Sequence, residues 1–117
     1  MKTEITLNGH VTRLNTLFGL HWAKRNRVKH DDMEWIAIEC CNQGVTRAAT
    51  KKRVSIVVTC GPKGRMPDPD AFLKVILDGL VRCGALVDDS SKWCEIGDLF
   101  VVRGTVRSTT ITLEDVQ

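Results

Sequence analysis

Four segments of the chain have the side chains expected of β-strands. Residues 2–8 alternate polar and apolar positions and meet a turn at Asn8-Gly9, which predicts a first strand. Residues 53–60 have the strongest strand character, and Gly61-Pro62 ends them. Residues 94–103 and 105–113 are predicted to be two closing strands, with Gly104 as the turn residue between them.

Two further segments have apolar residues at helical spacing. The first covers about 31–43, where Asp31 is placed to cap the helix, with Glu34 completing a capping box, and Gly44 can end it. The second covers about 69–83 and ends at Gly84. Residues 12–30 give a mixed signal because Gly19 interrupts a helical spacing. The order of elements predicts a single α+β domain over 1–117, with two main helices packed on one mixed sheet.

The charge of the chain is divided unevenly. Residues 1–65 carry 12 Lys and Arg against 5 Asp and Glu, whereas residues 66–117 carry 5 against 9. A basic front region suits a polyanionic partner and an acidic rear region suits cations, although scattered surface charge is the simpler explanation. No apolar run approaches the roughly 18 residues that span a bilayer, and the N-terminus lacks a signal-peptide pattern. We therefore expect a cytoplasmic protein with no membrane partner.

The five cysteines contain no Cys-x-x-Cys spacing, so they are expected to be reduced and mostly buried. Neither they nor the three histidines have the spacing of a zinc site. No nucleophile elbow indicates a serine or cysteine hydrolase.

Four aspartates stand in two pairs around the second predicted helix. Asp68 and Asp70 flank Pro69 at its start, and Asp88 and Asp89 follow its end. Carboxylates that a fold brings together repel one another and require a divalent cation, and ionised oxygen ligands are what magnesium prefers. Together with the basic front region, these pairs predict a metal-dependent nuclease. The simpler interpretation is that they cap helices or complement a helix dipole.

Lys74 has two interpretations. The polar stripe of the second helix consists of Asp70, Lys74, Asp78 and Arg82 at successive i,i+4 positions. Such ion pairs stabilise a helix by about 0.3 kcal/mol each. Alternatively, the Lys74 ammonium lies one turn from the metal and stabilises charge developing on a phosphoryl group. The spacing allows both.

This segment resembles the RusA family of Holliday-junction resolvases. The family pattern is D-x-D-N-x-x-K-x-x-x-D-x-L, then A-G, then D-D. At the same spacing this chain has Asp68, Asp70, Lys74, Asp78 and Leu80, then Cys83-Gly84, then Asp88-Asp89. Asn15 is similar to the family's N-terminal asparagine. The family's asparagine after the second aspartate is Ala71 here, and the proline-rich segment before Asn15 is missing.

The resemblance implies a RusA-like fold and a homodimeric crossover junction endodeoxyribonuclease. Such an enzyme resolves four-way DNA junctions in recombination and repair, with Mg²⁺ as cofactor and Mn²⁺ as an alternative. The essential acids of the family would fall on Asp68, Asp70 and Asp89, with Asp88 as a further metal ligand, and the family's lysine on Lys74. Because resolution needs two cuts related by a two-fold axis, a symmetric dimer is expected.

Clusters of basic residues are predicted to bind the phosphates of branched DNA. The DNA-binding residues expected are Lys24, Arg25, Arg27, Lys29, Lys51, Lys52, Lys63 and Arg65, together with Asn15. Trp22 is expected to pack in the core or in a subunit interface, with stacking on an unpaired base as the alternative. Trp35 and Trp93 are expected to be structural.

Two other functions remain open. A non-catalytic binder of branched DNA would use the basic surface beside a decayed metal site, and Ala71 is the feature that favours it. A small metal-dependent phosphohydrolase would turn over mononucleotides and show no salt-sensitive binding to DNA.

Overall fold

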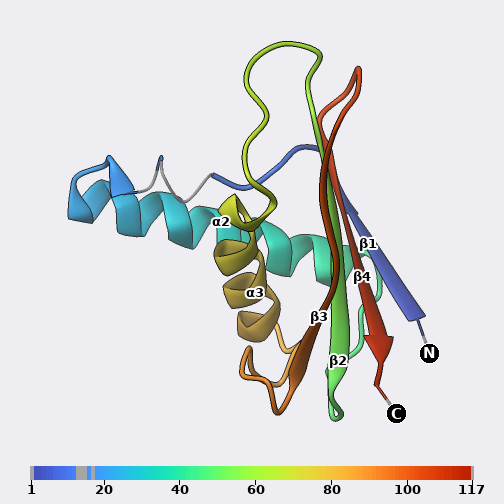
Figure 1. Ribbon diagram of the computed structural model, residues 1–117. Helices are drawn as coiled ribbons and strands as arrows, with labels where there is room; N and C mark the ends of the chain where they lie inside the picture. Colours follow the sequence, from blue (N-terminus) through green and yellow to red (C-terminus); the bar gives the residue numbers. More distant parts are fainter. Residues whose placement is uncertain (1, 13–15, 17, 117) are drawn as a thin grey trace.

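The computed structural model describes residues 2–12, 16 and 18–116, and they form a single α+β domain (Figure 1). Its elements are β1 (Lys2–Leu7), α2 (Trp22–Asn42), β2 (Lys52–Cys60), the 3₁₀ helix η1 (Pro69–Ala71), α3 (Leu73–Arg82), β3 (Cys94–Arg103) and β4 (Ser108–Asp115). All four strands lie close to their predicted ranges. No described helix is both long enough and apolar enough to span a membrane.

The strands form one mixed sheet in the order β1-β4-β2-β3. β4 is antiparallel to both β1 and β2, whereas β3 is parallel to β2. A parallel pair needs a crossover connection, and the segment containing α3 provides it. The two closing strands are therefore separated by β2, and Gly104 begins a connection that passes over the end of β2. A Cβ on Gly104 would lie 2.6 Å from Cγ2 of Thr59, so this crossing requires glycine.

Both helices pack on one face of the sheet, and the other face is uncovered (Figure 1). Alternate strand residues point toward the helices, which is typical of a sheet covered on one side. The buried core includes Ile5, Leu7, Val54, Ile56, Val58 and Ile111 from the strands, with Ile36, Phe72, Val75, Ile76 and Leu80 from the segments that cover them.

α2 is longer than the helix predicted over 31–43. It begins at Trp22, so Asp31 lies inside the helix and the predicted capping box is wrong. The N-cap is His21, whose Nδ1 accepts a hydrogen bond from the backbone N of Ala23 (3.4 Å). Residues 22–43 contain neither Gly nor Pro and are rich in good helix formers, so the helix continues through Asp31. Gly44, with φ +73°, follows its end as predicted.

The second predicted helix is divided at Phe72. Residues 69–71 form η1, and α3 starts only at Leu73. Phe72 is completely buried, and its φ of −108° departs from α-helical geometry. Asp68 precedes η1, but its side chain makes no capping hydrogen bond. Asp68 therefore stands at the N-cap position of η1 without acting as a side-chain cap, and the prediction of one continuous helix over 69–83 is wrong.

α2 and α3 approach closely where Gly79 faces Ile36. A Cβ on Gly79 would lie 2.9 Å from Cδ1 of Ile36, so glycine permits this contact. The approach places the side chains of α2 beside the polar stripe of α3, and Met33 of α2 lines one side of the site described next.

Candidate active site

Asp68 and Asp70 both have exposed side chains around η1. Within the described part of the chain, neither carboxylate has a hydrogen-bond or ion-pair partner. Only their backbones are engaged. The carbonyl oxygen of Asp68 accepts a hydrogen bond from the N–H of Ala71 (3.0 Å), and that of Asp70 accepts one from the N–H of Phe72. Both carboxylates are therefore available to a ligand.

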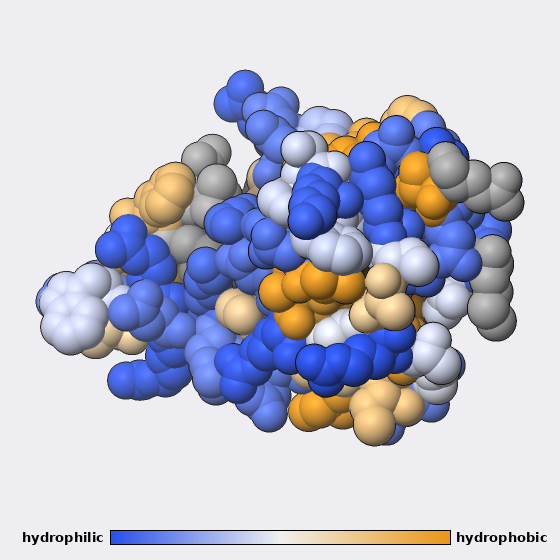
Figure 2. Space-filling model, turned by 90° about the horizontal axis from the view of Figure 1, so that it is seen from below, coloured by the Kyte–Doolittle hydropathy of each residue, from blue (hydrophilic) through white to orange (hydrophobic). Residues whose placement is uncertain are grey.

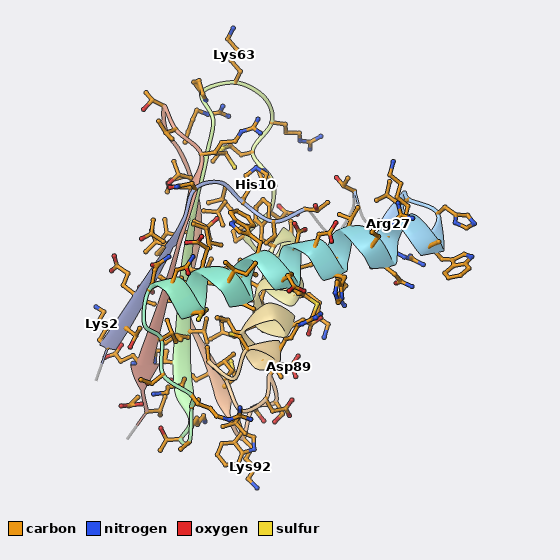
Figure 3. All side chains as sticks on the ribbon, turned by 180° about the vertical axis from the view of Figure 1, so that it is seen from behind. Lys2, His10, Arg27, Lys63, Asp89 and Lys92 are labelled. Carbon is orange, nitrogen blue, oxygen red and sulfur yellow. The ribbon has the colours of Figure 1, made fainter. Side chains whose placement is uncertain are left out.

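The second pair lies in the exposed loop after α3. A hydrogen bond from the Ser90 hydroxyl, supported by the backbone N–H groups of Asp89 and Ser90, lowers the pKa of Asp88. The loop brings Asp89 back to α3 (Figure 3), where its Oδ2 lies 3.4 Å from Nζ of Lys74. Residues 15 positions apart therefore meet on the exposed face of α3.

Lys74 lies between two carboxylates. Its Nζ is 3.2 Å from Oδ1 of Asp78 and 3.4 Å from Oδ2 of Asp89. These two partners, with Asp78 the stronger, raise the pKa of Lys74. The side chain therefore stays an ammonium at neutral pH. It cannot serve as a general base, but it can stabilise negative charge on a phosphate.

A cleft of about 390 Å³ lies along this face of α3, and we call it the acidic cleft. Its lining residues are Met33, Lys74, Asp78, Val81, Arg82, Asp88 and Asp89. α2 contributes one side, where Nζ of Lys29 lies 2.9 Å from Oδ2 of Asp78. Arg82 donates to Oε2 of Glu34 on α2 (3.3 Å). Of the predicted i,i+4 ladder, only the Lys74–Asp78 pair forms among the described residues.

Sequence reasoning missed the pairing of Lys29 with Asp78. The predicted first helix began at residue 31, which left Lys29 outside it. The actual helix contains Lys29 and crosses α3 at Gly79. The signal that could have identified the contact is Gly79 within the otherwise apolar face of α3, because glycine inside a helix often marks a close approach.

The donor atoms suit a hard cation, but they do not form a complete cage. Among the described residues, no three Asp, Glu, His or Cys side chains are placed to hold a metal ion together. Magnesium usually keeps several waters and takes one or two carboxylates together with substrate phosphates. The carboxylates available to it are Asp68 and Asp70 at η1 and Asp88 and Asp89 at the acidic cleft.

The predicted DNA-binding residues are divided among three places. Lys24, Arg25, Arg27 and Lys29 lie on the first half of α2, which extends away from the sheet (Figures 1 and 3). Lys51 and Lys52 lie at the start of β2, where Lys52 is paired with Asp115. Lys63 and Arg65 follow the other end of β2. Asn15 lies outside the described residues.

Trp22 is 63% exposed, so the expectation that it packs in the core is wrong, whereas its packing in a subunit interface stays a prediction. The cause is the length of α2, whose first turns project away from the sheet (Figure 1). Trp35 packs against the core as expected, and Trp93 is partly buried beneath the Lys92 ammonium. Viewed from below, hydrophilic residues cover most of the surface and hydrophobic residues form separate patches (Figure 2).

All five cysteines are free thiols, and Cys40, Cys60 and Cys94 are buried. The prediction of reduced and mostly buried cysteines is therefore confirmed.

No protein-family model matches this chain, and no curated protein is significantly similar to it. The function is therefore inferred from the residues and their arrangement.

Proposed function

We propose that this protein is a metal-dependent endonuclease of the RusA type that cuts four-way junctions in DNA. The observation that carries the proposal is the 3.4 Å contact between Lys74 and Asp89. It joins the lysine and the second acid pair of the family pattern, and Asp70 precedes Lys74 by four residues. Free carboxylates at Asp68 and Asp70 support the same assignment, because a merely structural cap would use them.

In this proposal, one or two carboxylates together with the substrate phosphates would hold Mg²⁺ or Mn²⁺, and the candidates are Asp68 and Asp70 at η1 and Asp88 and Asp89 at the acidic cleft. The bound cation would supply an activated water and neutralise charge on the scissile phosphate. Lys74, kept protonated by Asp78 and Asp89, stabilises charge that develops on the phosphate oxygens. The cations on the first half of α2 contact flanking phosphates, and the exposed Trp22 among them is available to stack on an unpaired base.

The proposed active form is a homodimer, because two matched cuts need two sites related by a two-fold axis. Light scattering across a range of protein concentrations, beside the cleavage assay, measures this. A protein that stays monomeric while making paired cuts would contradict the dimer.

The decisive experiment compares cleavage of a synthetic four-way junction with cleavage of linear duplex of the same sequence. Wild type, Asp70→Asn and Asp98→Asn are assayed in Mg²⁺, in Mn²⁺ and in EDTA. Asp98 is a matched control because it is an exposed aspartate on β3, away from α3. We expect Asp70→Asn to cut the junction at least roughly 100-fold more slowly than wild type, and Asp98→Asn to cut normally.

Binding in Ca²⁺ is measured for the same proteins. Unchanged cleavage by Asp70→Asn would rule out the assigned site. Junction binding without cleavage in every metal would favour the non-catalytic binder. Turnover of mononucleotides without salt-sensitive DNA binding would favour the small phosphohydrolase.

A further inference from the structure

A second concave site lies at the end of the sheet where β2 finishes and β3 turns toward β4. It has a volume of about 220 Å³, and its lining includes His10, Lys63, Arg65, Arg103 and Arg107. We call these five residues the basic pocket. No Asp or Glu is among the residues that line it. Its cations come from the loop after β2 and from the end of β3 with the connection that follows it. These segments are distant in sequence, so no single sequence cluster predicts the pocket.

The charges of the basic pocket are not neutralised by the protein. Within the described residues, Lys63, Arg65, Arg103 and Arg107 form no ion pair with a carboxylate. Four like charges around one hollow repel one another, and an anion in the hollow would relieve that repulsion. Arginine is especially suited to this role, because its planar guanidinium can donate two hydrogen bonds to one phosphate.

Hydrogen bonds and packing contacts hold the side chains of the basic pocket in position. Arg103 donates to the carbonyl oxygens of Gly61 (3.4 Å) and Gly64 (2.8 Å), which ties the loop after β2 to β3. Gly64 has φ +95°, which favours glycine. Nε of Arg107 lies 3.5 Å from the position a Cβ of Gly61 would take, so it packs directly over that loop.

His10 forms another part of the lining. Its Nδ1 is hydrogen-bonded to the carbonyl oxygen of Val11 (2.9 Å), so that nitrogen carries the proton. The ring also packs against Phe72, with the ring centroids 5.1 Å apart. Its position is therefore fixed by the core, next to the loop cations.

We infer that the basic pocket binds a backbone phosphate of the DNA, outside the site of cleavage. Only Met66 and Pro67 lie between Arg65 and Asp68, so at most roughly 10 Å of extended chain joins the pocket to the first carboxylate pair. A phosphate held there would fix a DNA strand beside η1 without carrying sequence information. This inference rests on the proposed function for its choice of ligand, but not for the existence of the pocket.

The test measures the salt dependence of junction binding in Ca²⁺, where cleavage is suppressed. The variant Lys63→Gln/Arg107→Gln removes two pocket cations and spares Arg103, which holds the loop. We expect its affinity to fall about tenfold, typical of one lost charge-assisted contact. The slope of log affinity against log salt should also become shallower by about 0.9 for one lost phosphate contact.

Two control variants accompany it. Lys63→Arg/Arg107→Lys keeps both charges and should restore the slope. Lys2→Gln removes a charge from the exposed side of β1, far from Lys63 in Figure 3, and should leave the slope unchanged. Melting temperatures of all variants are measured to confirm that they are folded.

Each outcome is informative for the pocket and for the nuclease separately. An unchanged slope in Lys63→Gln/Arg107→Gln overturns the pocket, even if wild type cleaves junctions. A shallower slope with no cleavage by wild type in any metal supports the pocket and contradicts the nuclease. Stabilisation of wild type by inorganic phosphate, with the DNA slope unchanged, would assign the pocket to a small anion and overturn the DNA proposal. Failure of wild type to bind DNA overturns it as well.

Discussion

The acidic cleft and the basic pocket differ in whether their charged side chains form ion pairs. In the acidic cleft, cations and carboxylates are paired: Lys74 contacts Asp78 and Asp89, and Lys29 contacts Asp78. In the basic pocket, the described cations form no ion pair: Arg103 donates to backbone carbonyl groups, and the cations lie close enough to repel one another. Paired charges hold each other in position, whereas unpaired charges attract a ligand from solution. We therefore expect the acidic cleft to orient its own charged side chains for a reaction and the basic pocket to bind an anion.

The largest effect is expected from Lys74→Met, which tests whether the cleft orients a reacting group. Loss of the ammonium should slow single-turnover junction cleavage about 100-fold, because one stabilising charge is removed from the transition state. Stability should change by less than about 1 kcal/mol, since the Lys74 side chain is 55% exposed and such pairs contribute little. Rapid-quench cleavage and thermal unfolding measure the two quantities.

Lys2→Met is the matched control for that experiment, because it removes an exposed lysine at the other edge of the molecule. A normal cleavage rate in Lys74→Met would mean that Lys74 only links Asp78 to Asp89. The acidic cleft would then be structural, and the comparison with the pocket would lose its functional meaning.

The sequence alone predicts much of the fold and the elements of the acidic cleft. The four strands, the end of α2 at Gly44 and the paired aspartates around α3 are all visible in local patterns. Local patterns suffice there because strand alternation and glycine at a helix end reflect only neighbouring residues.

The remaining features depend on contacts between distant segments. The break between η1 and α3 falls at Phe72, whose side chain is completely buried, and local helix propensity does not report it. The Lys29–Asp78 pair needs the crossing of α2 and α3 at Gly79. The basic pocket joins a loop to Arg103, which is 42 residues from Gly61. A sequence pattern that spans only a few neighbouring residues does not encode a contact between segments so far apart in the chain.

A smaller effect is expected from Asp78→Asn, which should make the acidic cleft resemble the basic pocket. Asp78 pairs with both Lys29 and Lys74, so its loss frees Lys29 and leaves Lys74 with Asp89 as its remaining carboxylate partner. We expect junction affinity in Ca²⁺ to rise several-fold, with a salt slope steeper by about 0.9 for each phosphate newly contacted. Fluorescence anisotropy at several salt concentrations measures this, with Asp98→Asn as the control. Identical slopes in the two variants would show that these cations do not face DNA.

The smallest effect concerns the helix contact that positions the cleft, and it leaves the carboxylates untouched. Cys40 of α2 and Cys83 at the end of α3 share a hydrogen bond, which lowers the pKa of Cys83 to about 6. The pKa of Cys40 is raised, chiefly by the same hydrogen bond. Because the folded-state pKa of Cys83 lies below its ordinary value of 9.0, the stability that this thiolate contributes is present above pH 9 and is lost as the pH falls through about 6.

Alkylation by iodoacetamide can test this pair in a Cys41→Ser background, since Cys41 is the exposed cysteine. The reaction at Cys83 should reach half its maximal rate near pH 6. Adding Cys40→Ala removes the hydrogen-bond donor, so the midpoint should move upward, while adding Cys83→Ser abolishes the reaction. Junction cleavage should be unaffected, because neither thiol lines the acidic cleft. A midpoint near pH 9 in the presence of Cys40 would mean that the two helices do not hold these thiols together, and the wall that α2 gives to the acidic cleft would then be misplaced.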